Sequence, residues 1–337
     1  MKKLGVLVRG AGWVAGEHIK AYMANPNTEL KVVDSRLQSE LDEKKSACGL
    51  DCELTVDLYE EHLTRDDIDL VSICTISCEH TREAIQAANA GKHVFIEKPV
   101  SVTLDELRNL RDAVEANGVA AAAGFVVRFY PLIRNIRKIV DEGTIGDVFY
   151  GGCDYWHEIK GEWKTSPEKA GSSLLMGGCH SMDTLQWLMD SEITEVTAYS
   201  CNPARRKDFE YDPNIVVNLK FANGRIGRVA CSIECNMPYV FHLELKGTDG
   251  AIRNDKFFTT QIPHLQGWIS IPCVGPDSPD VTHHPFDDEI DYFIDSVITD
   301  RIEADRAWRQ ALRVHEACFA ADQSAGSGGT PIKLPIL

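Results

Sequence analysis

The sequence predicts an α/β protein, with a doubly wound parallel sheet in its N-terminal part and an α+β domain with a mostly antiparallel, open sheet in its C-terminal part. Apolar runs alternate with helical patterns from residue 4 to about residue 125, which indicates βαβ units. After Phe125 the apolar runs follow one another through short turns, which favours antiparallel pairing. The first run, Leu4–Val8, precedes Gly10-Ala11-Gly12 and a helical pattern, as in a dinucleotide-binding unit.

The N-terminal elements have recognisable ends. Thr103 and Glu106 have the spacing of a capping box at the start of a helix. Gly91 and Gly118 follow helical patterns and are expected to be C-caps. The expected strands are Leu4–Val8, Leu30–Val33, Leu70–Cys74, Val94–Ile96 and Val119–Phe125, and the expected helices are Ala15–Ala24, Leu37–Ala47, Thr81–Ala90 and Leu104–Asn117.

The C-terminal part begins with a helical pattern and continues as strands. Asn223-Gly224 and Asp249-Gly250 are typical of hairpin turns. We therefore expect a dinucleotide-binding domain over residues 1–124 and a second domain over residues 125–337. The expected strands are Val148–Tyr155, Val196–Cys201, Ile215–Phe221, Arg225–Cys235 and Phe241–Lys246, and the expected helices are Leu132–Asp141, Leu174–Met189, Asp287–Thr299 and Asp305–Ser324.

Length and charge restrict the function classes. A chain of 337 residues is long enough for about two domains with separate cores. The formal net charge of −16 repels nucleic-acid phosphates and anionic lipids. No apolar run approaches the ~20 residues of a membrane span, and the run before Arg9 is too short for a signal peptide. We therefore expect neither a nucleic-acid partner nor a membrane partner.

The eleven cysteines are typical of buried thiols in a reducing compartment, which predicts a cytoplasmic protein. Cys48 with Cys52, and Cys74 with Cys78, have a C-x₃-C spacing that can imitate a zinc site. However, Cys74 ends a strand that is expected to be buried, and Cys48 ends a helical pattern. We expect no metal, with structural zinc as the alternative.

The glycine turn predicts a dinucleotide-binding site of the Rossmann type. Gly10 allows a sharp turn, Gly12 allows close approach of a pyrophosphate, and Ala15 lets the helix pack on its strand. Asp34 ends the next apolar run, where a carboxylate accepts hydrogen bonds from the adenine ribose and repels a 2′-phosphate. Arg36 is an opposing signal, because a guanidinium can bind that phosphate. We expect NAD rather than NADP.

Two polar segments are candidates for the chemistry. Glu97 and Lys98 follow the expected strand Val94–Ile96, at the carboxyl edge where open α/β sheets build their sites; the alternative is a solvated charge pair. His180 and Asp183 lie three residues apart, so they share a helix face and the carboxylate could orient a basic imidazole. The alternative there is a partly buried histidine with a purely structural role.

An aromatic and polar cluster follows the first strand of the second domain. Aromatic faces with hydrogen-bonding tips suit carbohydrates, which present both C–H faces and hydroxyl groups. Tryptophans that only pack the domain are the alternative. The cluster comprises Tyr155, Trp156, His157, Trp163 and Lys164.

Several short motifs, spread over nearly the whole chain, are informative in combination. They are Gly10–Ala15, Thr75 with His80, Ala90–Pro99, Arg128-Phe129, Gly143–Gly146, Cys179–Asp183 and Gly247–Gly250. In this combination they resemble the Gfo/Idh/MocA family of nicotinamide-dependent oxidoreductases, which includes inositol dehydrogenases and glucose–fructose oxidoreductase. The Glu97-Lys98-Pro99 segment is the most specific part.

The resemblance implies a Rossmann domain followed by a substrate-binding domain whose open sheet forms a homodimer or homotetramer face. It makes Lys98 the active-site lysine and His180 the proton-transfer histidine. Two departures matter: Ile76 follows Thr75 where the family often has proline, and Met176 stands where inositol dehydrogenases carry an aspartate. A thioether is a weak acceptor, so the substrate can differ from theirs, and Asp183 should matter more.

The function expected is hydride transfer between a nicotinamide cofactor and a sugar, sugar derivative or cyclitol. The alternatives are glycoside cleavage with a tightly held NAD, and a non-catalytic protein that senses a nicotinamide or a sugar. The catalytic residues expected are Lys98, His180 and Asp183. The expected cofactor-binding residues are Gly10, Gly12, Trp13, Val14, Asp34, Arg36, Thr75, His80, Glu97 and Lys98. The expected substrate-binding residues are Arg128, Tyr155, Trp156, His157, Trp163, Lys164 and His180.

Overall fold

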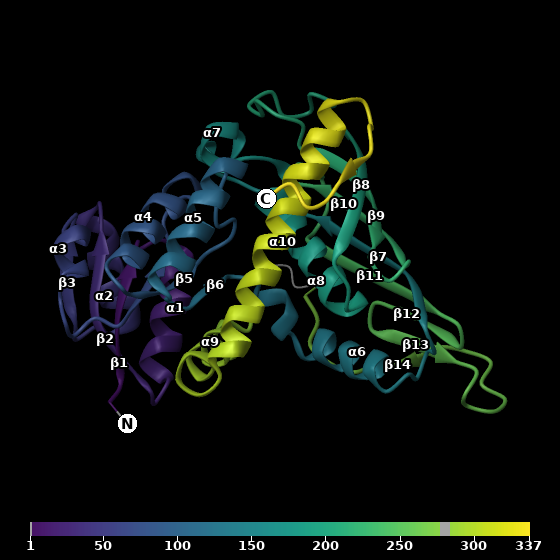
Figure 1. Ribbon diagram of the computed structural model, residues 1–337, viewed down its shortest axis with the longest axis horizontal. Coiled ribbons are helices and arrows are strands. Elements are labelled where there is room, and N and C mark those ends of the chain that lie inside the picture. Colours follow the sequence, from purple (N-terminus) through teal and green to yellow (C-terminus); the bar gives the residue numbers. More distant parts are fainter. Residues whose placement is uncertain (1, 277–283) are drawn as a thin grey trace. The chain divides into compact units, whose positions relative to one another are not determined.

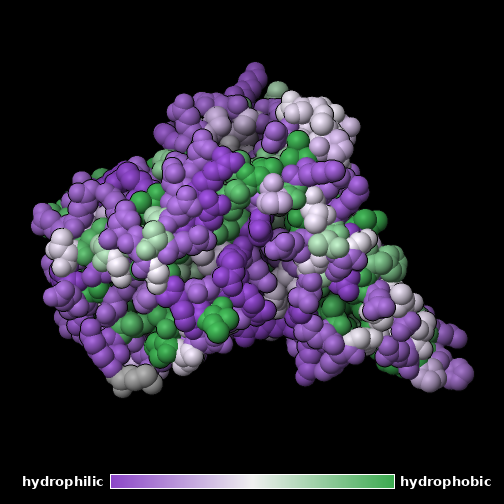
Figure 2. Space-filling model, in the orientation of Figure 1, coloured by the Kyte–Doolittle hydropathy of each residue, from purple (hydrophilic) through white to green (hydrophobic). Residues whose placement is uncertain are grey.

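The computed structural model describes residues 2–276 and 284–337, and the chain divides into two compact units (Figure 1). The first unit comprises Met1–Phe125 and Pro285–Leu312, and the second comprises Val126–His284 and Arg313–Leu337. In the part of the chain that the structure describes, no helix combines the length and apolarity needed to cross a bilayer. The face visible in Figure 2 is largely hydrophilic, with small scattered hydrophobic areas.

The first unit contains a six-stranded parallel sheet in the order β3-β2-β1-β4-β5-β6. This order confirms the doubly wound sheet, because the chain reverses direction between β1 and β4. The strands are β1 Leu4–Arg9, β2 Thr28–Ser35, β3 Glu53–Val56, β4 Leu70–Ile73, β5 His93–Ile96 and β6 Ala121–Ala123. The helices are α1 Trp13–Ala24, α2 Gln38–Cys48, α3 Tyr59–Leu63, α4 Ser77–Asn89, α5 Leu104–Asn117 and α9 Phe286–Thr299.

Several local signals act as the sequence indicates. Thr103 and Glu106 form the capping box of α5, and Gly118 ends that helix with φ 59°. The short pair β3 and α3 was missing from the sequence-based prediction. Its strand has only four residues with a single buried one, so it carries almost no periodic apolar signal.

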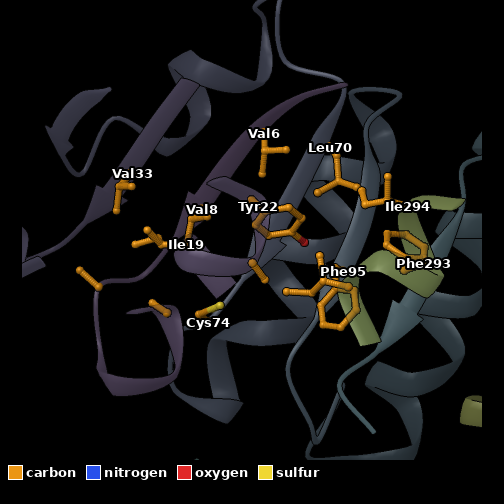
Figure 3. Close-up of a cluster of buried hydrophobic side chains, with 14 of the residues drawn as sticks. Val6, Val8, Ile19, Tyr22, Val33, Leu70, Cys74, Phe95, Phe293 and Ile294 are labelled. Carbon is orange, nitrogen blue, oxygen red and sulfur yellow. The ribbon is translucent and has the colours of Figure 1, made fainter. Parts of the chain in front are cut away.

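The core of the first unit includes a helix that is distant in sequence. Phe293 and Ile294 of α9 pack in one buried cluster with Tyr22 and Phe95 (Figure 3). The Phe95 and Phe293 rings lie 5.5 Å apart in an edge-to-face arrangement. The apolar face of α9 therefore belongs to the sheet of the first unit.

The second unit contains a nine-stranded sheet in the order β14-β13-β12-β11-β7-β10-β9-β8-β15. Its pairings are antiparallel except that of β7 with β10, which confirms the mostly antiparallel sheet. The strands are β7 Val148–Trp156, β8 Ile193–Cys201, β9 Asn214–Phe221, β10 Ile226–Ser232, β11 Val240–Gly247, β12 Gly250–Arg253, β13 Lys256–Thr259, β14 Ile269–Ser270 and β15 Ile332–Lys333.

Helix α8 (Cys179–Met189) packs on β7 because the strand offers a small residue there. A Cβ on Gly151 would lie 3.0 Å from Leu185 and 3.3 Å from Met189. A π-helical turn, η3 (Leu174–Gly178), leads directly into α8. The remaining helical elements are η1 Val126–Phe129, α6 Pro131–Asp141, η2 Glu162–Thr165, α7 Pro167–Ala170 and α10 Arg301–Gly326, of which α10 runs from the first unit into the second.

Candidate functional site

The glycine turn after β1 has the geometry that a pyrophosphate needs. Gly10 has φ 101°, and a Cβ there would lie 2.7 Å from the Cys74 carbonyl oxygen, so only glycine fits. A Cβ on Gly12 would meet nothing within 4 Å, which leaves room for a ligand. Gly12 is also the N-cap of α1, and no side chain caps that helix. The free N–H groups of its first turn therefore fit a phosphate group.

Asp34, the expected ribose-binding residue, belongs to a buried ionic network around Arg9. The Arg9 guanidinium donates to Asp34 Oδ1 and, over 2.9 Å, to Glu83 Oε1. Asp34 Oδ2 accepts from Thr55 Oγ1 at 2.7 Å and from the Leu58 N–H at 2.9 Å. The Asp34 carboxylate is therefore fully buried, with both oxygens already hydrogen-bonded.

Arg9 was not among the residues expected from the sequence. The sequence does contain a signal for it: Arg9 is a charged residue at the end of an otherwise apolar strand, directly before Gly10. Burial lowers the pKa of Arg9, but Glu83 and Asp34 outweigh this and raise it above its ordinary value. The guanidinium therefore stays charged between two buried carboxylates.

Arg36, the possible phosphate-binding cation, forms an ion pair with Glu79 in the first turn of α4, with a nitrogen–oxygen distance of 3.0 Å. Both side chains are partly exposed, so this pair is weak. It nevertheless directs Arg36 toward a carboxylate. The contacts of Arg36 therefore give no support to binding of a 2′-phosphate.

Thr75 and His80 lie together near the Glu97-Lys98-Pro99 segment. His80 Nδ1 is 2.7 Å from the Pro99 carbonyl oxygen, and Nε2 is 2.9 Å from the Thr75 carbonyl oxygen. The Thr75 hydroxyl donates to Glu83 at 2.7 Å. His80 thus connects the end of β4 to the segment that follows β5.

Glu97 is buried, whereas Lys98 is half-buried. Glu97 Oε1 lies 3.1 Å from His18 Nε2, and Glu97 Oε2 accepts the Lys98 backbone N–H over 3.2 Å. A Cβ on Gly124 would lie 2.9 Å from Glu97 Oε1, so the glycine leaves space for the carboxylate. Glu97 therefore supports the turn that presents Lys98.

In the second unit, His180 lies in the first turn of α8 and is buried against Tyr155 of β7. The two rings stack with centroids 6.2 Å apart and an interplanar angle of 24°. Gly177 makes this possible, because a Cβ there would lie 2.4 Å from the Tyr155 ring. Tyr239, which the sequence analysis did not identify, packs edge-on against Tyr155 and His157.

Asp183 and Arg128 form a bidentate ion pair. Arg128 Nε and Nη2 donate to the two carboxylate oxygens, and Asp183 is almost fully buried. Burial raises the pKa of Asp183 despite the opposing effect of Arg128. Asp183 was expected to orient His180, but both of its oxygens are hydrogen-bonded to Arg128.

The remaining residues that were expected to bind substrate or cofactor lie in different elements of the two units. Trp163 and Lys164 lie together in η2, with the ammonium nitrogen 5.5 Å from the Trp163 ring centroid. Trp156 ends β7 and, because side chains alternate along a strand, faces the side of the sheet opposite to Tyr155. Trp13 is half-exposed beside Phe286, and Val14 is the next residue of α1.

The cysteines are all free, and no group of metal-ligating side chains occurs among residues 2–276 and 284–337. Cys74 is buried within the sheet of the first unit, where its sulfur lies 3.4 Å from His18 Nδ1. Cys48 and Cys52 pack against the core of the same unit. Cys48, Cys52 and Cys74 therefore contribute to the packing of the first unit.

Two family models match the chain. Residues 4–125 match an oxidoreductase family with an NAD-binding Rossmann fold, and residues 133–253 match the GFO/IDH/MocA C-terminal domain. The NAD(+)-dependent scyllo-inositol 2-dehydrogenase of Bacillus subtilis is 26% identical over 250 residues, which cover 73% of this chain and 72% of that protein.

Two further relatives extend the comparison. The 2,7-anhydro-N-acetylneuraminate hydratase of Mediterraneibacter gnavus is 28% identical over 262 residues, covering 76% of this chain and 68% of that protein. The structure of a levoglucosan dehydrogenase with NADH and L-sorbose superposes with a TM-score of 0.86 over the whole of both chains, at 21% identity. At that identity the likeness concerns the fold.

Proposed function

This chain belongs to the Gfo/Idh/MocA family of NAD-binding oxidoreductases. From this premise we propose that it transfers a hydride between NAD and a carbon atom of a sugar, sugar derivative or cyclitol. That carbon carries a hydroxyl group in the reduced substrate and a carbonyl group in the oxidised one. Its inositol dehydrogenase relatives support the substrate class. The observation that carries the proposal is the conjunction of an open glycine turn, Lys98 at the carboxyl edge of the same parallel sheet, and a buried His180.

The glycine turn and the uncapped start of α1 hold the pyrophosphate in this proposal. When bound, the nicotinamide accepts or donates the hydride. The buried Asp34 carboxylate lies near the end of β2, where its negative charge disfavours a 2′-phosphate and supports NAD over NADP.

Lys98 and His180 take the acid–base roles in our proposal. His180 removes the hydroxyl proton as the substrate is oxidised, because an imidazole titrates near neutral pH. Lys98 hydrogen-bonds the reacting oxygen and stabilises the negative charge that develops there. Asp183 lies on the same helix as His180, and its ion pair with Arg128 ties this helix to η1.

The substrate meets the aromatic group formed by Tyr155, His157 and Tyr239, in this proposal. Stacked and edge-on rings offer faces for C–H groups, and the His157 ring adds a polar tip. Met176 is buried in η3, four residues before His180. Its thioether is a weaker hydrogen-bond acceptor than the carboxylate of an aspartate.

A panel of sugars, sugar acids and cyclitols, each mixed with the protein and NAD, tests this function. We expect NADH to form with at least one member, and much less to form with NADP. Absence of NADH across the panel, with NAD binding intact, would contradict a dehydrogenase that reduces NAD in net turnover.

One relative favours a second candidate, a reaction without net turnover of the cofactor. That relative is named a hydratase of an anhydro sugar acid. In that reaction the residues of the glycine turn would hold NAD tightly, and the cofactor would supply a transient oxidation of the sugar that is reversed before product release. Product that forms from an anhydro sugar or glycoside without accumulation of NADH, and without added NAD, distinguishes it from the dehydrogenase.

We also propose that the protein is a cytoplasmic homodimer or homotetramer. Eleven free thiols suit a reducing compartment. The nine-stranded sheet carries exposed apolar side chains on β7, β8, β9 and β10, namely Phe149, Tyr199, Val216 and Ile226. Light scattering at several concentrations measures the assembly, and a monomer at all of them would refute it.

A further inference from the structure

A fully buried histidine on α1 contacts the segment that carries the proposed catalytic lysine. His18 has no exposed surface. Its Nε2 lies 3.1 Å from Glu97 Oε1, and its Nδ1 lies 2.9 Å from the Ser72 hydroxyl of β4. The Phe95 ring packs edge-on at 5.2 Å, and Phe286 lies 5.6 Å away. Both ring nitrogens of His18 therefore have polar partners, and two phenylalanine rings pack against the imidazole.

The other Glu97 oxygen continues this connection to the backbone. Glu97 Oε2 accepts the Lys98 N–H over 3.2 Å. Behind the carboxylate, Gly124 leaves space that a Cβ would fill. A chain of contacts thus leads from α1, which begins at the glycine turn, through His18 and Glu97 to the backbone of Lys98.

We propose that His18 is a positioning residue, which holds the Glu97 carboxylate beneath the turn that presents Lys98. His18 also ties this turn to the helix whose N-terminus faces the cofactor. The position of Lys98 relative to the glycine turn is therefore fixed. This inference rests on the proposed role of Lys98, since a fixed lysine matters only if it acts on a substrate.

The charges around the pair favour an ionic contact. Burial lowers the pKa of His18, but Cys74 and Glu97 outweigh it and raise the pKa well above its ordinary value. Burial raises the pKa of Glu97, but His18, Lys98 and His80 bring it below its ordinary value. A buried imidazolium beside a buried carboxylate is a rigid contact, because removal of either partner leaves a buried charge unpaired.

Histidine NMR tests the contact directly, without any activity. In ¹⁵N-labelled protein near neutral pH, we expect His18 to show both ring nitrogens protonated, with the signal assigned by its loss in His18→Gln. In Glu97→Gln the signal of Nε2 should shift, because this nitrogen loses its carboxylate partner. An Nε2 that carries no proton in the wild-type protein, or an Nε2 signal that is unchanged in Glu97→Gln, would overturn the contact that the proposal needs.

Kinetics on a substrate from the panel test the positioning role. His18→Leu should lower kcat by about 10²-fold, the effect of a misplaced reacting group, while NADH affinity in a fluorescence titration changes far less. His18→Gln should recover part of this loss, because its amide nitrogen can still donate to Glu97. The control is Tyr22→Leu, which removes a buried ring from the same helix that lies 6.5 Å from His18.

A double-variant comparison separates positioning from general support of the fold. In a Lys98→Met background, the additional His18→Leu change should leave kcat almost unaltered, because the lysine that His18 positions is already gone. Additive losses, or an equal loss in Tyr22→Leu, would show that His18 acts through stability alone. If no substrate is found, the proposed function fails, whereas the NMR experiment still decides whether the His18–Glu97 contact exists.

Discussion

At the scale of single residues, the proposal depends most on His180 and Lys98. His180→Ala should lower kcat by about 10²–10⁴-fold, which is the usual contribution of a positioned acid–base group. Lys98→Met should lower kcat comparably, because the developing charge on oxygen loses its donor. NADH binding should persist in both variants, since neither change alters the proposed pyrophosphate site at Gly10 and Gly12. Full kcat in either variant would contradict the assignment.

The Arg128–Asp183 pair makes a prediction about stability. Arg128→Met removes the partner of a buried carboxylate, so the free energy of unfolding should fall by about 3 kcal/mol. The double variant Arg128→Met/Asp183→Asn should recover much of this loss, because no unpaired charge remains. Urea unfolding of the three proteins measures it. Equal stability of wild type and Arg128→Met would mean that the pair contributes nothing.

The network around Arg9 makes a prediction about cofactor choice. Asp34→Ser removes one carboxylate and leaves part of the Arg9 guanidinium without its partner. The ratio of NADPH to NADH affinity should then rise by about tenfold, or about 1.4 kcal/mol. Fluorescence titration with both cofactors gives the ratio. The control is Asp57→Ser, since Asp57 is exposed and 3.3 Å from Arg9. No change of the ratio in Asp34→Ser would show that Asp34 does not select the cofactor.

At the scale of elements, α10 carries a carboxyl group with an unusual titration. Burial raises the pKa of Asp322 to about 7, although a hydrogen bond from Ser172 lowers it. A carboxyl whose pKa is higher in the folded than in the unfolded protein favours folding when protonated. Its contribution to stability is complete below its ordinary pKa of 3.8 and is lost as the pH rises to about 7.

Asp322→Asn should therefore raise the melting temperature at pH 8, and raise it less at pH 5, because the amide mimics the protonated acid and only part of the stability is lost at pH 5. Thermal unfolding of both proteins at the two pH values measures this difference. A greater gain at pH 5 than at pH 8 would reverse the sign and contradict the assignment. Asp305→Asn, on the same helix but partly exposed beside Arg301, is the matched control.

Most elements were predictable because their signals are local. The capping box at Thr103, the turn at Gly10 and the alternation of strands and helices each arise from a few neighbouring residues. The short strand β3 was missed because four residues with one buried side chain carry no clear period. The packing of α9 into the first unit depends on contacts across the whole chain, such as that of Phe293 with Phe95.

The partners of the site residues were less predictable than their identities. A spacing of three residues suggested that Asp183 faces His180, but Arg128 reaches both of its oxygens from η1. The same holds for Asp34, whose hydrogen bonds come from Arg9, Thr55 and Leu58. Sequence spacing predicts which residues share a face, whereas these partners come from elements that only the fold brings together.

At the scale of the whole molecule, the two family models cover a cofactor-binding part and most of the sheet of the second unit. Such a division suits an enzyme in which one part binds the cofactor and the other binds the substrate. Lys98 comes from the first unit and His180 from the second. The central claim is therefore that both act in one hydride transfer.

Transfer of deuterium from substrate to cofactor tests that claim most directly. A member of the sugar and cyclitol panel that yields NADH is prepared with deuterium on the oxidised carbon, and the cofactor is analysed by mass spectrometry. We predict one deuterium in the NADH, a lower rate than with the unlabelled substrate, and no labelled cofactor with His180→Ala at the same enzyme concentration and time. NADH without deuterium, or no NADH from any member while NAD remains bound, would contradict hydride transfer as the function of this protein.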